Sequence, residues 1–132
     1  PNLDNIPVIR IPEVFMNRAE AMATPGSPVF DETAARNDLI RLKQNRYTSY
    51  ATSQQTFDAG LTGSALFEEI IRQRRLEFAY EGHRFFDLKR LGRDIVGKAQ
   101  SANLPYTDFR ILAPFPIRET DLNPGLLQNF GY

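Results

Sequence analysis

Residues 66–92 constrain this chain most, because they combine a helical repeat of apolar residues with charges on the apolar side. When Phe67 is the origin of a helical wheel of about 100° per residue, Ile71, Phe78 and Phe85 fall within about 40° of it. Such a stripe is typical of a helix that faces a protein core. The pattern predicts a mainly α-helical fold organised around a central helix in this stretch.

Charged residues interrupt the stripe. Arg74 and Glu81 lie on it and Glu77 at its edge, and a charge on an apolar face is costly unless it is paired and hydrogen-bonded. Arg74 and Glu77 can meet at i,i+3, whereas Glu77 and Glu81 are like charges that need a shared cation, which Arg74 or Arg84 could supply. We expect a half-buried network that fixes how the helix docks on its neighbours. Its members are Arg74, Glu77, Glu81, Gly82, Arg84 and Asp87.

The first part of the chain predicts a helical hairpin. Residues 1–11 read as extended, and Pro12 suits the first position of a helix that ends before the Pro- and Gly-containing segment 24–28. Asp31 is a good N-cap for a second helix, which ends around residues 45–47. The hairpin could pass for one tetratricopeptide-type unit, although the repeat signature is absent.

Residues 48–63 are polar and lack a period, which predicts a long irregular loop. Three aromatic residues belong to this part of the chain: Tyr47 directly before the loop, and Tyr50 and Phe57 within it. These rings either anchor the loop to the core or form a platform on which a sugar stacks, because aromatic rings pack against apolar ligand faces. We favour anchoring, and keep the three as candidate ligand-binding residues.

Ser64 is the predicted N-cap of the central helix, and Gly82 is its predicted C′ residue. Residues 83–91 predict a second short helix. Residues 93–108 read as a loop, and residues 109–115 either pair as a short strand or simply pack. The tail from residue 116 on is rich in Pro, Asn and Gly but keeps large apolar residues, so we expect it to wrap and dock on the body.

Composition excludes several classes of function. Among 132 residues, 16 Lys and Arg balance 16 Asp and Glu, which argues against non-specific binding to nucleic acid or anionic membranes. The basic residues of the central stretch suggest a nucleic-acid-binding helix, but nearly as many acidic residues accompany them. There is no cysteine, and His83 is the one histidine. We predict no metal, no cofactor and no nucleic-acid partner.

Three segments carry a resemblance. They are RRLEFAYEGHRFFDLKRLG at residues 74–92, LAPFPI at 112–117 with QNFGY at 128–132, and the weaker RAEA at 18–21. In their order along the chain, these segments resemble the C-terminal part of the SusD/RagB family, outer-membrane nutrient-binding lipoproteins of Bacteroidetes-type bacteria. Phe86 stands where the family usually has Trp, and Phe130 where it has Pro.

The resemblance implies a tetratricopeptide-like helical scaffold. It also implies that residues 1–132 form a single C-terminal region of a longer protein, whose missing N-terminal part carries the lipid anchor. Such proteins lie at the cell surface, capture oligosaccharides or other nutrients, and hand them to a TonB-dependent outer-membrane transporter. They have no catalytic machinery. No family ligand contact maps onto a position of this sequence.

An enzyme is the alternative, and the most plausible one is a glycoside hydrolase that uses Glu77, Glu81 or Asp87. Such an enzyme needs two carboxyl groups that face each other across the substrate, about 5–10 Å apart. Burial and pairing discriminate between the two functions, because a carboxylate held by arginines stays ionised and is a poor general acid. We favour the non-catalytic binding protein.

Overall fold

The structure is a computed structural model that describes residues 9–97 and 103–132. It divides into two compact units, Pro1–Ala79 (unit 1) and Tyr80–Tyr132 (unit 2). The predicted extended start lies mostly outside the described residues, as do residues 98–102 of the predicted loop 93–108.

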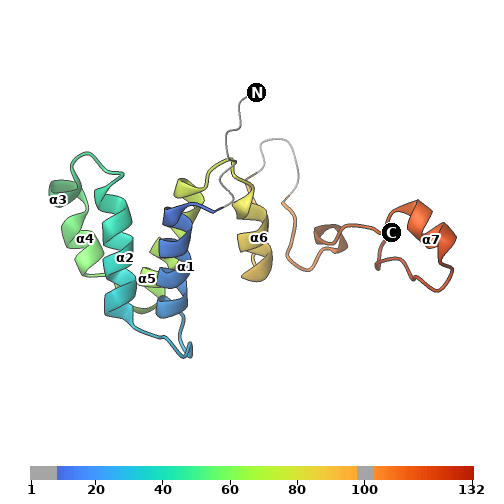
Figure 1. Ribbon diagram of the computed structural model, residues 1–132, viewed down its shortest axis with the longest axis horizontal. Helices are drawn as coiled ribbons and strands as arrows, with labels where there is room; N and C mark the ends of the chain where they lie inside the picture. Colours follow the sequence, from blue (N-terminus) through green and yellow to red (C-terminus); the bar gives the residue numbers. More distant parts are fainter. Residues whose placement is uncertain (1–8, 98–102) are drawn as a thin grey trace, which may run out of the picture. The chain divides into compact units, whose positions relative to one another are not determined.

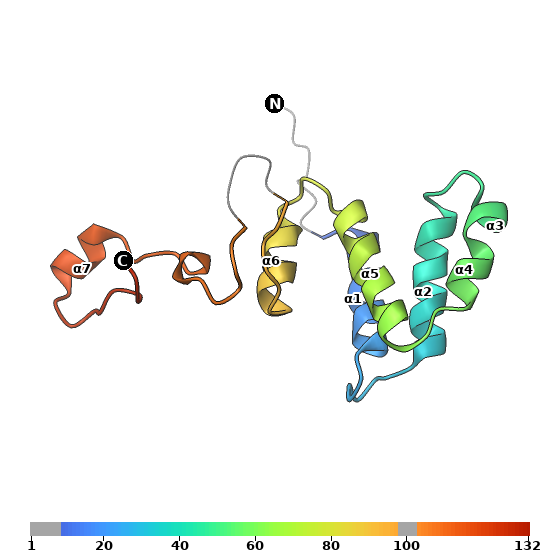
Figure 2. The same ribbon diagram turned by 180° about the vertical axis from the view of Figure 1, so that it is seen from behind.

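Unit 1 is built on a helical hairpin, as predicted. Helices α1 (Ile11–Ala23) and α2 (Glu32–Gln44) run antiparallel, and α5 (Gly63–Glu77) packs against both (Figures 1 and 2). Both predicted start signals are confirmed. A proline lies in the first turn of α1, and the Asp31 side chain accepts a hydrogen bond of 2.9 Å from the backbone N–H of Ala34.

Apolar residues of these three helices, together with Leu61 before α5 and Phe78 after it, form the core of unit 1. Alanines on facing turns let α1 and α2 approach closely, and leucines and isoleucines fill the space that remains. The buried core residues are Met16, Ala19, Ala23, Ala35, Leu39, Leu42, Leu61, Leu66, Ile70 and Phe78.

The predicted loop over residues 48–63 is wrong for its middle part. Two short helices form there, α3 (Tyr50–Ser53) and α4 (Gln55–Ala59), and both pack on α2. Serine and threonine hydroxyls weaken a helix in isolation because they compete for backbone groups. Here the burial of Tyr50 and Asp58 against the rest of unit 1 outweighs that local preference.

The limits of the central helix also differ from the prediction. The helix begins at Gly63, with Thr62 rather than Ser64 at the N-cap position, and it ends at Glu77. Gly82 is therefore not its C′ residue: with φ +82° it precedes the next helix, α6 (His83–Arg90). The apolar spacing continues in phase across this break, so the period could not reveal it, and Phe85 lies on α6, where it is 40% exposed.

Unit 2 contains α6, the 3-10 turn η1 (Phe109–Ile111) and α7 (Ile117–Leu122). An antiparallel bridge joins Ile95 to Leu104. The described residues 109–115 form no strand, so of the two alternatives the strand is wrong, and α7 was not predicted. The mainly helical fold class is confirmed. None of the described helices has the length and apolar character needed to cross a membrane.

The end of the chain folds back on the segment before α7. The Gln128 amide donates to the carbonyl of Phe115 (3.0 Å) and accepts from its N–H (2.7 Å), and the Asn129 amide donates to the carbonyl of Ala113 (2.6 Å). The Tyr132 hydroxyl donates to the carbonyl of Leu112 (3.0 Å). Side chains of the QNFGY segment therefore bind backbone groups of the LAPFPI segment, within unit 2.

Candidate functional site

The residues of the predicted charged network are distributed over both units. Arg74 and Glu77 belong to unit 1, whereas Glu81, Gly82, Arg84 and Asp87 belong to unit 2.

Arg74 is buried on α5, only 5% exposed, although it carries a charge. Its Nη1 donates to Asn17 Oδ1 at 2.6 Å, its Nε lies 3.7 Å from Glu20 Oε2, and its guanidinium lies over the Phe78 ring. The guanidinium thus ties α5 to α1, which is the docking role expected of a buried arginine.

Glu77 is held by other arginines than expected. Arg10 Nη1 donates to Glu77 Oε1 at 3.2 Å, and Arg46 binds the carboxylate with both Nε and Nη2 at 2.8 Å. The expected pair between Glu77 and Arg74 is wrong, because the carboxylate binds Arg10 and Arg46 instead. Both arginines are far from Glu77 in the sequence, so only the folded chain brings them to it. The Arg46 hydrogen bonds, against the opposing effect of burial, lower the pKa of Glu77.

In unit 2, Asp87 is the buried member of the predicted set, 3% exposed, and it accepts a hydrogen bond of 2.7 Å from Arg90 Nη2. Glu81 is exposed and precedes Gly82 at the start of α6. Asp87 and Arg90 are spaced i,i+3 on α6, so a short-range contact satisfies this carboxylate.

The most deeply buried charges were not predicted from the sequence. Lys43 and Asp58 are both fully buried, and Glu69 is 6% exposed. Lys43 Nζ donates to Asp58 Oδ1 at 2.6 Å, to Glu69 Oε1 at 2.9 Å and to Gln54 Oε1 at 3.2 Å. The Tyr50 hydroxyl donates to Asp58 Oδ2 at 2.9 Å. We call these five residues the Lys43 cluster.

The electrostatics of the Lys43 cluster keep its carboxylate on α5 ionised. Burial by itself raises the pKa of Glu69, but hydrogen bonds from Arg72, Gln73 and Lys43 and the Lys43 charge outweigh it and lower the pKa to about 2. All buried side-chain nitrogen and oxygen atoms of the described residues have a hydrogen-bond partner. The cluster is thus a satisfied polar network of the kind that specifies one packing of a core.

A sequence signal for part of this cluster exists. Lys43 lies four residues after Leu39 and next to Leu42, so the helical period places it beside the core face of α2. Asp58 gives no such signal, because its helix was not predicted.

The three aromatic candidates differ in environment. Tyr50 is buried, and burial followed by its bond to Asp58 raises the pKa of its hydroxyl, which therefore stays protonated. The Tyr47 hydroxyl is half-buried and accepts from the Gln73 amide at 3.1 Å. Phe57 is 56% exposed. Anchoring thus accounts for the two tyrosines, and a role in ligand binding for any of the three stays a prediction.

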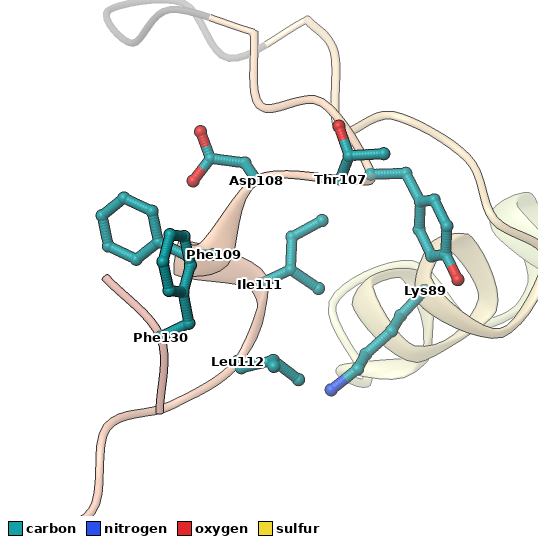
Figure 3. Close-up of a pocket in the computed structure, with 8 residues that line it drawn as sticks. Lys89, Thr107, Asp108, Phe109, Ile111, Leu112 and Phe130 are labelled. Atoms are coloured by element: carbon teal, nitrogen blue, oxygen red, sulfur yellow. The ribbon is translucent and has the colours of Figure 1, made fainter. Parts of the chain in front are cut away.

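A hollow of about 680 Å³ opens on unit 2 (Figure 3). In Figure 3, Lys89 of α6 lies on one side of it and Phe109 and Phe130 lie on the other, with Ile111 and Leu112 between them. Tyr106, Thr107 and Asp108 complete the lining. Aromatic and aliphatic walls with a few polar groups are typical of small-molecule sites.

Catalytic arrangements are hard to build from these groups. Within the described ranges, no three His, Asp or Glu side chains are placed to hold a metal ion. Arg46 and Arg10 hold Glu77 and lower its pKa, so its carboxylate is unsuited to donate a proton. Asp87 accepts a hydrogen bond from Arg90.

The chain matches the model of the SusD family over residues 2–132. It is 26% identical to a SusD-like protein from Formosa agariphila, over 96% of this chain and 24% of that relative. Its structure is similar to the crystal structure of a proposed sugar-binding protein from Bacteroides vulgatus, with a TM-score of 0.72 and 28% identity over 99% of this chain and 31% of that chain.

The chain thus spans 24% of the curated relative and 31% of the solved structure that it resembles. The family match covers both units, including the segments 74–92 and 112–132 that carried the resemblance. The chain belongs to the SusD family.

Proposed function

We propose that this chain is part of a non-catalytic protein that binds carbohydrate at the bacterial outer-membrane surface. The match to the SusD family over residues 2–132 carries the proposal. The likeness to a proposed sugar-binding protein supports carbohydrate as the class of ligand. In this function the protein captures an oligosaccharide and delivers it to a TonB-dependent transporter, and a lipid anchor holds it at the membrane.

The pairing of the acidic residues supports a binding protein over a glycoside hydrolase. Glu77 bears two arginines and has a lowered pKa, whereas the general acid of a glycosidase needs a raised one. The scaffold role proposed for Arg74 and Glu77 agrees with this, because buried ion pairs orient helices rather than donate protons.

A glycan-array screen of the chain tests the proposal, with release of new reducing ends measured on the same glycans. We expect binding without turnover, both for the wild type and for Glu77→Gln. Turnover by the wild type that the Glu77→Gln variant loses would show a hydrolase instead. Co-purification of the chain with a TonB-dependent transporter tests the delivery step, and its failure leaves binding as a separate result.

A further inference from the structure

The hollow on unit 2 combines exposed aromatic rings with polar groups that have no protein partner. Tyr106 is 45% exposed and Phe130 93% exposed. Among the described residues, the Lys89 ammonium, the Thr107 hydroxyl and the Tyr106 hydroxyl make no hydrogen bond or ion pair. Ring faces with free donors beside them are what a pyranose needs, since its C–H face stacks and its hydroxyls accept and donate.

The charge available in the hollow is positive. Asp108 is the acidic residue of the lining, and Arg110 holds both of its carboxylate oxygens at 2.9 and 2.8 Å. In Figure 3 the Asp108 carboxylate points away from Ile111 and Leu112. Lys89 therefore remains as the uncompensated charge of the lining.

Contacts inside unit 2 hold the walls in place. The backbone N–H of Tyr106 donates to Asp94 Oδ1 at 2.8 Å, and its ring lies against Gly92. The Phe109 ring meets Tyr132 edge to face, with centroids 5.2 Å apart. Phe130 belongs to the QNFGY segment, which folds back on residues 112–115.

We propose that this hollow binds an acidic sugar unit, one that carries a carboxylate or sulfate group. The sugar ring stacks on the exposed aromatic rings of the hollow, Tyr106 and Phe130, and the acidic group pairs with Lys89 Nζ. This inference rests on the proposed function and adds to it a place and a class of ligand.

A matched pair of ligands tests the inference by calorimetry on the whole chain. The first ligand is a tetrasaccharide that contains glucuronate, and the second is the same tetrasaccharide after reduction of its carboxylates to alcohols. A sulfated neutral tetrasaccharide forms the third arm and separates sulfate from carboxylate. We expect the acidic ligands to bind more tightly than the reduced one, with a preference that weakens as salt is added.

Variants identify the residues responsible. Lys89→Met should weaken binding of the acidic ligands at least tenfold, or about 1.4 kcal/mol, and should remove the preference over the reduced ligand. Lys89→Arg keeps the cation and should keep the preference. Tyr106→Leu should weaken acidic and reduced ligands alike, because stacking does not depend on the carboxylate. Arg118→Met removes an exposed cation outside the hollow and is the matched control.

The outcomes separate the two proposals. Binding of glycans by the wild type with a preference that survives in a folded Lys89→Met variant refutes this site and leaves the proposed function intact. The same holds if acidic and reduced ligands bind equally well. Failure of the wild type to bind any glycan, on the array or by calorimetry, overturns both.

Discussion

Removal of the buried Lys43 ammonium group tests whether the Lys43 cluster stabilises unit 1. Lys43→Met keeps most of the side chain's volume but leaves Asp58, fully buried, and Glu69, 6% exposed, without their shared cation. Glu69 retains Arg72 and Gln73, whereas, among the residues that the structure describes, Asp58 retains the Tyr50 hydroxyl as its one side-chain donor. The cost therefore falls mainly on Asp58.

The structure indicates the size of the effect. The lost contacts are hydrogen-bonded ion pairs of 2.6 and 2.9 Å in the interior of unit 1. Breaking a buried pair by removal of one partner destabilises proteins by about 3–5 kcal/mol, since the remaining charge is stranded. With a denaturant dependence of about 2 kcal/mol per molar urea, the midpoint of unfolding should fall by about 2 M.

The pH dependence gives a sharper test. In the variant, Glu69 has lost the Lys43 hydrogen bond and the Lys43 charge, two of the causes that lower its pKa, so the variant should lose less stability than the wild type as pH falls. The wild type loses stability over the same range, because its Glu69 pKa of about 2 lies below the ordinary 4.5. The two stabilities should converge between pH 7 and pH 4.

Urea unfolding followed by circular dichroism at pH 7 and pH 4 measures this convergence. Arg75→Met removes an exposed cation from α5, the helix that carries Glu69, and should change stability by less than about 0.5 kcal/mol. The double variant Lys43→Met with Asp58→Asn should recover part of the loss at pH 7. A Lys43→Met deficit below about 1 kcal/mol, or one that is equal at both pH values, would refute the buried-cation reasoning.

Three further predictions follow from single groups. The wild type should lose about 2 kcal/mol of unfolding free energy between pH 6 and pH 3, because Glu69 takes up a proton in the unfolded chain while it stays ionised in the folded one, and Glu69→Gln should flatten that slope in pH-dependent urea titrations. Gly131→Ala, where φ is +93° and a Cβ would collide with the Phe109 ring, should release the chain end and speed its cleavage by carboxypeptidase, whereas Gly125→Ala should not. Arg74→Ala should cost about 3–5 kcal/mol in urea unfolding, and a near-native midpoint would contradict its buried role.

The helices of unit 1 were largely predictable from the sequence. The proline in the first turn of α1 and the Asp31 cap of α2 act within one helical turn, so the information for them lies in neighbouring residues. The burial of Arg74 was also predictable, because the 3.6-residue period places it on the apolar face of α5 whatever its partner is.

The break after Glu77 was not predictable in the same way. The apolar stripe runs through it in phase, and only the backbone reveals that Tyr80 and Gly82 take positive φ values of 67° and 82°. The helices α3 and α4 were not predicted for a related reason. Their sequences have weak helical preference, and packing against α2 decides their conformation.

Charge pairing depended on the tertiary structure. By itself, the sequence determined that Arg74 and Glu77 need partners, because charges near a core are costly when unpaired. The tertiary structure decided which partners they find, since Arg10 and Arg46 lie 67 and 31 residues from Glu77. The contacts of Lys43 and the hollow beside Lys89 were likewise decided by the tertiary structure. Their groups come from segments far apart in the chain, and no local pattern specifies contacts that only the folded backbone creates.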